Sequence, residues 1–450
     1  MRSILIRRAS SLRGEVALLG DKSIAHRSII ISAISPGKTT IENFPTNKDC
    51  LYTLEAVKKL GVRIMPGYLK TGKKPTAITV VGKGLHGLKK PKSPIFVGDS
   101  GTTLRLLLGI LAGQNFKVKL IAGKSLSYRP MLRVNRPLRM MGAIIKSQIP
   151  NPKSQIPEEY PPITIRGGYL KPITYKMPVA SAQVKSAILL AGLYTKGLTT
   201  KVIEPVETRD HTERLLKLFK ADIQLKQNTI VIRGNKEFVS PKSIYIPGDI
   251  SSASFFLVLA SILPKAQILI RKVSLNPSRI GIIKVLKRMG ARIKVTSCKS
   301  QAVSYEPMGD IIVKNSKLKG TIIREEEIPS LIDELPILMV AASLASGKSI
   351  FRGPEELRVK ETDRIRSMSE NLKKMGADIQ LVKAAKSEKI VIQGVKELKG
   401  RRVSSYQDHR TAMSMVVAAL AAKGETRIDD IACINKSFPE FLSILETLIP

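Results

Sequence analysis

A short phrase that joins the end of a helix to the start of a strand recurs five times along the chain. Each copy has a helix tail, then Gly-Ala or a variant of it, then a branched strand residue. The copies are KKLGVRI, RMMGAII, KLFKADI, KRMGARI and KKMGADI, which end at Ile64, Ile145, Ile223, Ile293 and Ile379. Glycine suits the left-handed residue that ends a helix before a strand. The third copy has Lys220 in place of this glycine.

A second phrase, a polar cluster that opens an apolar helix, precedes each of these copies by about 40 residues. Its six copies begin at Gly20, Gly98, Ala180, Gly248, Ile332 and Gln407. Five of them carry an aspartate near the expected helix start, where a carboxylate caps free backbone amides. The sixth copy has no Gly-Ala phrase after it, because the chain ends at Pro450.

Strands are expected between these phrases. Period-2 segments at Ala77–Val81, Thr229–Ile232 and Lys389–Ile392 predict them. Six units of strands and two helices each predict an α/β (α+β) fold, and grouping them as three plus three gives two similar lobes. The boundary is expected near residues 241–247. Residues 146–160, where KSQIP occurs twice, are predicted to form an inserted surface loop.

The apolar segments and the cysteines exclude several classes of protein. No apolar run approaches the length that spans a membrane, and Phe255–Leu263 and Ala412–Ala422 predict buried helices instead. Cys50, Cys298 and Cys433 lie far apart, which argues against a disulfide framework or zinc cluster and fits a reducing cytoplasm. The four histidines lack metal-ligand spacing, so no metal is expected.

The charge balance is unusual. Lys and Arg total 75 against 36 Asp and Glu, and the net charge of +39 would attract anions such as nucleic acid, anionic lipid or acidic metabolites. The basic residues are dispersed, however, and the 4% of aromatic residues provides few platforms for base stacking. A general lysine bias therefore explains the charge better than a nucleic-acid footprint.

The first polar cluster, GDKSIAHR, has the features of an anion site. Gly20 and Asp21 predict a turn and a helix cap, and Lys22 and Ser23 stand at the helix start. Arg27 follows Ser23 at i+4, on the same helix face. Free amides, a hydroxyl and two cations favour a bound anion. A well-capped, exposed helix start fits the motif equally well.

Other clusters carry glycines, arginines and carboxylates. GDSGTTLR, which includes Gly101, would cradle a phosphate or carboxylate with its backbone amides. Arg129 stands in the rigid sequence Tyr128-Arg129-Pro130 and would fork onto a carboxylate, although a surface salt bridge is the simpler interpretation. QDHRTAM and CINKSFPEF add Arg410 at another helix start and Lys436 near the end of the chain.

Two acidic positions are candidates for proton transfer. In LRVKETDRIRSM, Glu361 lies beside Lys360 and Arg364, and a carboxylate held among cations stays ionised and can move protons. The alternative is an exposed, salt-bridged helix. In IPSLIDELPIL, Asp333 and Glu334 lie between apolar runs, where each is either a helix cap or a poised base.

Taken jointly and in order, nine motifs resemble the 5-enolpyruvylshikimate-3-phosphate synthase family. They are GDKSIAHR, GDSGTTLR, SLSYRPM, SAQVKSA, RDHTE, GDISSAS, LRVKETDR, QDHR and NKSFPEF. The resemblance implies two lobes of three βαβαββ units each, with the active site in the interdomain cleft. Residues 21–243 would form the first lobe and residues 1–20 plus 244–450 the second, with hinges near 20 and 243.

The implied reaction transfers the enolpyruvyl group of phosphoenolpyruvate to the 5-hydroxyl of shikimate 3-phosphate by addition and elimination. The family needs no metal or organic cofactor. We therefore expect a cytoplasmic monomer whose partners are these two substrates, with no nucleic acid and no membrane. In the family a glycine at the position of Gly101 leaves room for the inhibitor glyphosate, so inhibition competitive with phosphoenolpyruvate is expected.

The resemblance also implies roles for individual residues. Shikimate 3-phosphate would contact Lys22, Ser23, Arg27, Ser181, Gln183, Arg209, Asp333 and Lys360. Phosphoenolpyruvate would contact Lys22, Gly101, Arg129, Gln183, Arg364, Arg410 and Lys436. Asp333 would remove the proton of the 5-hydroxyl, and Glu361 with Lys22 would protonate and deprotonate the methylene carbon.

Four positions depart from the pattern of the family. Asp99 stands where Asn is common, and Ala182 replaces a serine that is a ligand in many members. Glu204 and Glu356 occupy places where some members have Ser and Asn, so those roles are not carried over. Arg209 would compensate for the hydroxyl that Ala182 lacks.

Two alternatives stay open at this point. The first is the related enolpyruvyl transferase that acts on UDP-N-acetylglucosamine, although the chain lacks the cysteine-bearing loop expected of it. The second is an RNA-binding or RNA 3′-phosphate cyclase-like protein, for which the high basicity is the only support.

Overall fold

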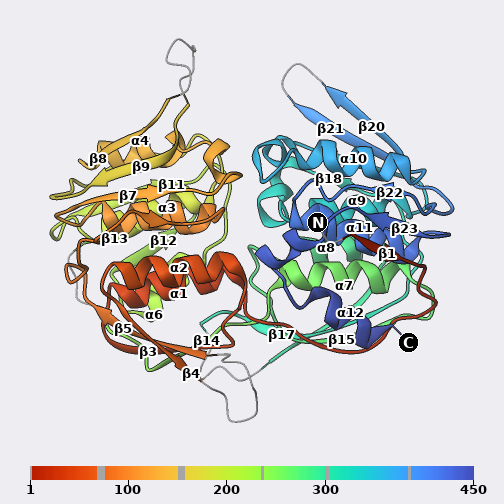
Figure 1. Cartoon of the computed structure of the whole chain (residues 1–450), viewed down its shortest axis with the longest axis horizontal. Helices are drawn as coiled ribbons and strands as arrows, with labels where there is room; N and C mark the ends of the chain where they lie inside the picture. The colour runs from red at the N-terminus through yellow and green to blue at the C-terminus, as the bar shows by residue number, and fades with distance from the viewer. Residues whose placement is uncertain are drawn as a thin grey trace. The chain divides into compact units, whose positions relative to one another are not determined.

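The computed structural model describes residues 3–67, 77–149, 158–234, 238–298, 305–383 and 387–449. These residues form two compact units, both of mixed α/β structure as the sequence predicts (Figure 1). The first unit contains residues 20–246 together with Tyr305 and Glu306. The second unit contains the residues up to Leu19, those from Pro247 to 298 and those from Pro307 onward.

Three four-stranded sheets in the first unit share one topology, in which the first two strands are parallel and the other pairs are antiparallel. In spatial order they are β14 (Ser243–Tyr245), β3 (Pro36–Glu42), β5 (Ala77–Lys83) and β4 (Arg63–Gly67); β6 (Ile95–Phe96), β7 (Lys117–Ile121), β9 (Tyr160–Arg166) and β8 (Ile144–Gln148); and β10 (Thr174–Lys176), β11 (Thr199–Ile203), β13 (Thr229–Arg233) and β12 (Ile223–Lys226). The strands predicted at 77–81 and 229–232 are confirmed.

The helices of this unit are of two kinds. The inner helices α1 (Lys22–Ala33), α3 (Gly101–Leu111) and α5 (Ala182–Gly192) are buried on nearly every side, and α3 packs against both α1 and α5. The outer helices α2 (Lys48–Lys59), α4 (Leu132–Met140) and α6 (His211–Leu218) bury one face and expose the other. Figure 1 shows α1 and α2 above the sheet that contains β3, β4 and β5. Most polar residues of these inner helices lie in their first two turns.

The second unit follows the same plan. Its sheets are β16 (Arg292–Ser297), β17 (Met308–Lys314), β15 (Gln267–Ser274) and β2 (Arg13–Ala17); β18 (Ile322–Ile323), β19 (Lys348–Arg352), β21 (Glu388–Gln393) and β20 (Asp378–Lys383); and β1 (Ile4–Ile6), β23 (Thr426–Ile428) and β22 (Arg402–Val403). Its inner helices are α7 (Ile250–Ile262), α9 (Leu335–Ser343) and α11 (His409–Ala421), and its outer helices are α8 (Gly281–Arg288), α10 (Arg364–Lys374) and α12 (Phe441–Leu448). The strand predicted at 389–392 and the buried helices predicted at 255–263 and 412–422 are confirmed.

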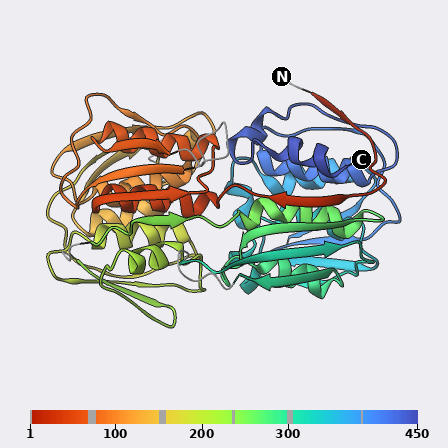
Figure 2. The same ribbon diagram turned by 90° about the horizontal axis from the view of Figure 1, so that it is seen from below.

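Two strands, β2 and β14, each belong to a sheet of one unit although the next helix in the sequence belongs to the other unit. β2 precedes α1 but pairs in parallel with β15 of the second unit, and Figure 2 shows this red N-terminal segment running along the green part of the chain. β14 precedes α7 but pairs in parallel with β3 of the first unit. This pairing places residues 244–246 in the first unit. Tyr305 and Glu306 also belong to the first unit, although the residues from Pro307 onward belong to the second.

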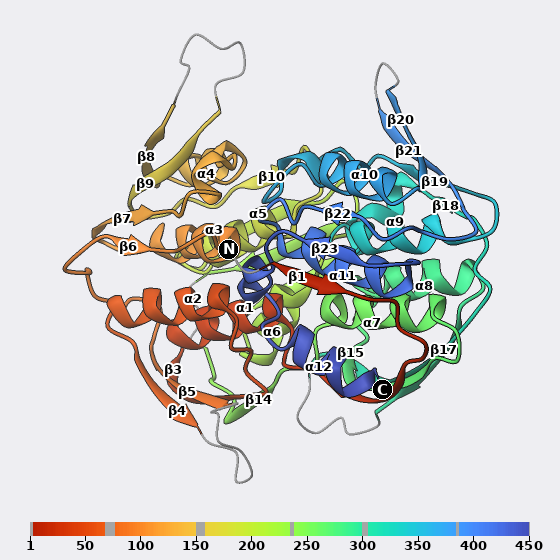
Figure 3. The same ribbon diagram turned by 45° about the vertical axis from the view of Figure 1, so that its right-hand side comes forward.

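The N-terminal strand completes the sixth repeat. β1 pairs antiparallel with β23, with Ile4 opposite Ile428 (Figure 3). A strand near the start of the chain thus belongs to the same sheet as β22 and β23 of the sixth repeat.

The recurring helix ends have the expected backbone. The φ angles are +86° at Gly61, +109° at Gly142, and +93° at both Gly290 and Gly376, which confirms the left-handed prediction. Lys220 adopts the same region, with φ of +61°, although a side chain disfavours it.

The segment expected to be an inserted surface loop is partly strand. Lys146 pairs with Thr164, and Gln148 with Tyr160, across a register shift between β8 and β9. Residues 146–148 and 160 therefore belong to a hairpin, because backbone pairing with the neighbouring strand continues through them. Residues 150–157, with most of the KSQIP repeat, lie outside the described part of the chain.

Across the described residues, none of the helices has the length and apolarity needed to cross a membrane.

Candidate functional site

Side chains cap most of the inner helices at the predicted clusters. The Asp21 carboxylate accepts from the amide of Ile24 at 3.0 Å at the start of α1, as the sequence predicts. Asp249 likewise caps α7, accepting from the amide of Ser251 at 2.8 Å. Asp408 caps α11 by accepting from the amides of Arg410 and Thr411, at 2.8 and 2.9 Å.

Two aspartates that were expected near helix starts do not act as caps. Asp99 accepts from the amide of Leu126 at 3.1 Å, and Ser100 caps α3 instead. Asp333 precedes the cap position of α9, which Glu334 occupies without a capping hydrogen bond from its side chain. The side chain of Asp333 is therefore available for other partners.

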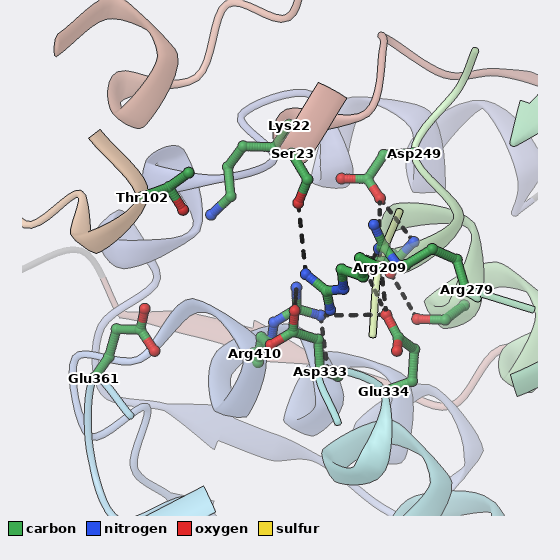
Figure 4. A network of polar contacts seen from close by, with 12 residues as sticks. Lys22, Ser23, Thr102, Arg209, Asp249, Arg279, Asp333, Glu334, Glu361 and Arg410 are labelled. Atoms are coloured by element: carbon green, nitrogen blue, oxygen red, sulfur yellow. Dashed lines mark hydrogen bonds and ion pairs between the residues drawn. The ribbon is translucent and has the colours of Figure 1, made fainter. Parts of the chain in front are cut away.

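The start of α1 gathers cations and hydroxyls. The Nζ of Lys22 forms an ion pair with Asp49 at 3.0 Å, and Arg209 donates to the Oγ of Ser23 at 3.5 Å (Figure 4). The structure thus brings together two residues that are far apart in the sequence.

Arg27 is held rigidly beneath the start of α1. Its side chain is 2% exposed, and its Nε donates to Thr212 at 2.7 Å. Its Nη2 donates to Ser186 at 2.9 Å, and its Nη1 donates to the carbonyl of Ser23 at 2.9 Å. Thr212 and Ser186 were not expected as functional residues. Their position within the RDHTE and SAQVKSA motifs is the signal that would have found them.

A second group forms around Gly101. A Cβ atom on Gly101 would lie 3.1 Å from Nη1 of Arg129 and 2.8 Å from Nη1 of Arg105. Arg105 donates to Gln183 at 2.7 Å, and Gln183 donates to Thr102 at 2.8 Å. Three residues predicted to contact one substrate, Gly101, Arg129 and Gln183, are therefore neighbours. Arg105 was missed, although it follows Gly101 by one helical turn on the same face.

Arg364 is the centre of the cluster in the second unit. The guanidinium is 1% exposed and lies 2.6 Å from Glu361, 3.0 Å from Asp408 and 3.6 Å from Asp333. Burial alone would lower its pKa, but these three carboxylates raise the pKa above the ordinary value. Arg364 therefore stays charged and can pair with an acidic ligand.

Arg410 completes this cluster. Its Nη1 donates to the carbonyl of Asp333 at 2.8 Å, and its Nη2 lies 3.5 Å from the Asp333 carboxylate (Figure 4). Asp333 therefore has an arginine on either side. An acid-base group next to two fixed cations is suited to reactions of anionic substrates.

Three more of the predicted residues, Lys360, Lys436 and Ser181, lie at the ends of other helices. The Nζ of Lys360 lies 3.9 Å from Glu356, and Lys436 is half-buried at the end of the short helix η4 (Ala432–Lys436). Ser181 caps α5 by accepting from the amide of Val184 at 3.4 Å. Glu204 accepts from the buried Lys185 at 2.9 Å, which gives this departure from the family a structural role.

Each unit thus contributes its own set of residues. The first unit contains Lys22, Ser23, Gly101, Arg27, Arg129, Ser181, Gln183 and Arg209, and the second contains Asp333, Lys360, Glu361, Arg364, Arg410 and Lys436. We call these sets the first and second half-sites. Both sets include cations in the first turn of an inner helix, Lys22 in α1 and Arg410 in α11, where the helix dipole also favours anions.

One group of potential metal ligands occurs among the described residues. The ligand atoms of Asp210, His211 and Glu306 lie within 4.8 Å of one another. His211 contacts Glu306 at 2.7 Å, and Arg214 pairs with Asp210 at 2.7 Å. These side chains are therefore already engaged with one another or with an arginine. Sequence spacing missed the group because Glu306 lies far along the chain from His211.

Comparisons with known proteins agree with one another. Residues 6–445 match the family model described as "EPSP synthase (3-phosphoshikimate 1-carboxyvinyltransferase)". A protein of Thermodesulfovibrio yellowstonii named 3-phosphoshikimate 1-carboxyvinyltransferase is 46% identical over 99% of both chains. A protein of the same name from Bacillus cytotoxicus is 43% identical over 98% of this chain and 99% of its own.

A solved structure is also similar. The EPSP synthase of Acinetobacter baumannii superimposes with a TM-score of 0.83 at 40% identity, and the match covers 99% of this chain and 98% of that one. The likeness therefore extends over the whole fold as well as over the motifs.

Proposed function

The chain belongs to the EPSP synthase (3-phosphoshikimate 1-carboxyvinyltransferase) family, and from this premise we propose the reaction that it catalyses. It transfers the enolpyruvyl group of phosphoenolpyruvate to the 5-hydroxyl of shikimate 3-phosphate and releases phosphate. The observation that carries the proposal is the second half-site, where Asp333 lies between Arg364 and Arg410. It supplies one candidate base and two cations for acidic substrates.

The chemistry proceeds in two balanced stages. In the addition, the 5-hydroxyl oxygen bonds to C2 of phosphoenolpyruvate, Asp333 takes the hydroxyl proton and C3 gains a proton. In the elimination, C3 loses a proton and the bond from C2 to the phosphate oxygen breaks, which leaves the enol ether and inorganic phosphate. Glu361 and Lys22 are the proposed partners in the proton transfers at C3.

Binding is assigned to both half-sites. Ser23, Arg27, Ser181, Gln183, Arg209, Asp333 and Lys360 are proposed to contact shikimate 3-phosphate, with Lys22 contacting both substrates. Gly101, Arg129, Gln183, Arg364, Arg410 and Lys436 are proposed to contact phosphoenolpyruvate. The fixed arginines support the binding of two acidic substrates, because planar guanidinium groups bind carboxylates and phosphates through two hydrogen bonds.

The surroundings of the enzyme also belong to the proposal. A cytoplasmic location fits the three free cysteines, of which Cys50 and Cys433 are buried. A monomer is proposed, with the two metabolites as its ligands and no nucleic acid. The comparisons favour neither the UDP-N-acetylglucosamine enzyme nor an RNA-processing protein.

A direct assay tests the reaction. Purified protein supplied with phosphoenolpyruvate and shikimate 3-phosphate is expected to release phosphate and form the enol ether in equal amounts. Omission of either substrate should abolish release, and UDP-N-acetylglucosamine should not replace shikimate 3-phosphate. Tight, salt-dependent RNA binding without turnover would instead favour the nucleic-acid alternative.

Glyphosate inhibition tests the environment of Gly101. Inhibition competitive with phosphoenolpyruvate is expected for the wild type. In Gly101→Ala the new Cβ would crowd Nη1 of Arg105 and of Arg129, at 2.8 and 3.1 Å. One added methyl group in a tight site changes binding by about 10-fold or more, so the glyphosate inhibition constant should rise by at least that factor.

The control for this experiment is Gly168→Ala, because a Cβ there meets nothing within 4 Å. Its inhibition constant should match that of the wild type. Uncompetitive inhibition of the wild type, or equal sensitivity of Gly101→Ala, would contradict the proposed position of Gly101.

A further inference from the structure

A network of polar side chains adjoins Asp333 and Arg410. The proposed function assigns no role to it. Its members are Asp249, Ser251, Arg279 and Glu334, which come from the starts of α7 and α9 and from the segment before α8 (Figure 4). All four belong to the second unit. Polar groups this deeply placed are costly unless they are paired, so their arrangement requires an explanation.

Glu334 is the centre of the network. Its side chain is 0% exposed, and its Oε1 accepts a hydrogen bond from the hydroxyl of Ser251. The same oxygen lies 4.0 Å from Nη1 of Arg410 and 4.0 Å from Nη2 of Arg279. Its Oε2 has no hydrogen-bond partner within the described part of the chain. The charge of this carboxylate therefore acts mainly on the two guanidinium groups beside it.

One side of the network is anchored in the core. Arg279 is 1% exposed and donates to the Oγ of Ser251 at 2.7 Å. It also lies 3.7 Å from Asp249, the residue that caps α7. Ser251 therefore accepts from Arg279 and donates to Glu334, which fixes the direction of its hydroxyl. The position of Glu334 is tied in this way to the start of α7.

The other side of the network reaches the second half-site. Arg410 donates to the carbonyl of Asp333, the residue that directly precedes Glu334. The Arg410 guanidinium is thus attracted by the carboxylates of Asp333 and Glu334 and is hydrogen-bonded to the backbone carbonyl that joins these two residues. If the charge of Glu334 is removed, only the Asp333 contacts remain of this set. The guanidinium then has more freedom to turn away from a ligand.

We propose that Glu334 is a positioning residue which, braced by Ser251 and Arg279, orients Arg410 and thereby sets the affinity for phosphoenolpyruvate. The inference rests on the proposed function, in which Arg410 contacts that substrate. Glu334 itself touches neither substrate in this scheme. Glu334 contributes by holding the Arg410 guanidinium in one orientation. A bidentate contact between a guanidinium group and an acidic ligand requires such a defined orientation.

The test uses Glu334→Gln in the full-length enzyme with both substrates. Glutamine keeps the side-chain volume and an acceptor for Ser251 but removes the charge that faces Arg410. The KM for phosphoenolpyruvate should rise about 10-fold, which corresponds to the weakening of one charged contact. The KM for shikimate 3-phosphate should change by less than about 2-fold, since Arg410 is not assigned to it.

A second variant keeps the proposal testable if Glu334→Gln folds poorly. Ser251→Ala removes the hydrogen bond that the Ser251 hydroxyl donates to Glu334. The KM for phosphoenolpyruvate should again rise, by a smaller factor, while the KM for shikimate 3-phosphate stays nearly unchanged. The effects of the two substitutions should be non-additive in the double variant, because both act through one contact. Glu327→Gln is the matched control, since Glu327 pairs with Arg288 at 2.8 Å outside this network. Its KM values should equal those of the wild type.

The outcomes separate this inference from the proposed function. A wild type that releases no phosphate from the two substrates would overturn the proposed function. An active wild type in which Glu334→Gln and Ser251→Ala leave the KM for phosphoenolpyruvate unchanged would overturn the inference alone. So would equal rises of both KM values accompanied by a lower melting temperature, because they would indicate a purely structural role.

Discussion

Replacement of Asp333 by asparagine is expected to lower kcat by about 10²- to 10⁴-fold, the contribution of a general base in other enzymes. The amide has nearly the shape of the carboxylate but cannot take the proton of the 5-hydroxyl. Its single oxygen can still face one of the two arginines, Arg364 and Arg410, which lie 3.6 and 3.5 Å from different oxygens of the carboxylate. Arg364 also keeps its contacts with Glu361 and Asp408, and Arg410 keeps its hydrogen bond to the backbone carbonyl of residue 333. Substrate binding should therefore fall much less than turnover.

Phosphate release under saturating substrates measures this kcat, and the two KM values measure binding. The matched control is Asp310→Asn, which makes the same change in an aspartate paired with the surface residue Arg271 at 2.8 Å. Its turnover should equal that of the wild type. Near-normal turnover of Asp333→Asn would show that another group removes the proton.

The repeating architecture was predictable because it depends on local rules. A left-handed residue must end each helix before a sharp turn into a strand, so glycine recurs at Gly61, Gly142, Gly290 and Gly376. Lys220 shows that the surrounding fold can impose the same backbone on a less suitable residue. The inner helices are largely apolar beyond their first two turns because they are buried on nearly every side. Both patterns are visible within single stretches of the chain.

Contacts between distant segments could not be deduced from spacing. The pairing of β2 with β15 joins residues that lie some two hundred and fifty positions apart, with Arg13 opposite Gln267, and no periodicity records it. Asp99 and Ser100 illustrate the same limit within one motif. Both can cap a helix, and the choice of Ser100 follows from the amide of Leu126, which engages Asp99. The network of Glu334 was hidden for the same reason, since Ser251 and Arg279 come from other elements.

The architecture also explains where the candidate residues lie. A buried, largely apolar helix can carry polar side chains at low cost near its start, where free amides and the helix dipole favour them. Farther along, such side chains need partners, as Arg27 has in Thr212 and Ser186. Such helices pack together in each unit: α3 packs against α1 and α5 in the first, and α7, α9 and α11 pack against one another in the second. The predicted residues at these positions therefore need not be close in sequence to act on one ligand.

Replacement of Arg27 by alanine is the second large effect expected, on substrate affinity rather than on chemistry. Arg27 is proposed to bind the phosphate-bearing substrate, and Thr212, Ser186 and the carbonyl of Ser23 hold its guanidinium in place. Loss of one charge-assisted contact costs about 1.5–3 kcal/mol, so the KM for shikimate 3-phosphate should rise roughly 10- to 100-fold. The KM for phosphoenolpyruvate should rise much less.

Initial rates with each substrate varied in turn measure this difference, and thermal unfolding reports whether the buried site tolerates the change. Arg27→Lys should give an intermediate rise, because the ammonium keeps the charge but cannot reach all three partners with a planar fork. Arg233→Ala, which removes an exposed arginine that donates to the carbonyl of Gly197, is the control and should leave both KM values unchanged. If Arg27→Ala instead raises the two KM values by the same factor, Arg27 does not distinguish the substrates. The assignment of shikimate 3-phosphate to this helix start would then be wrong.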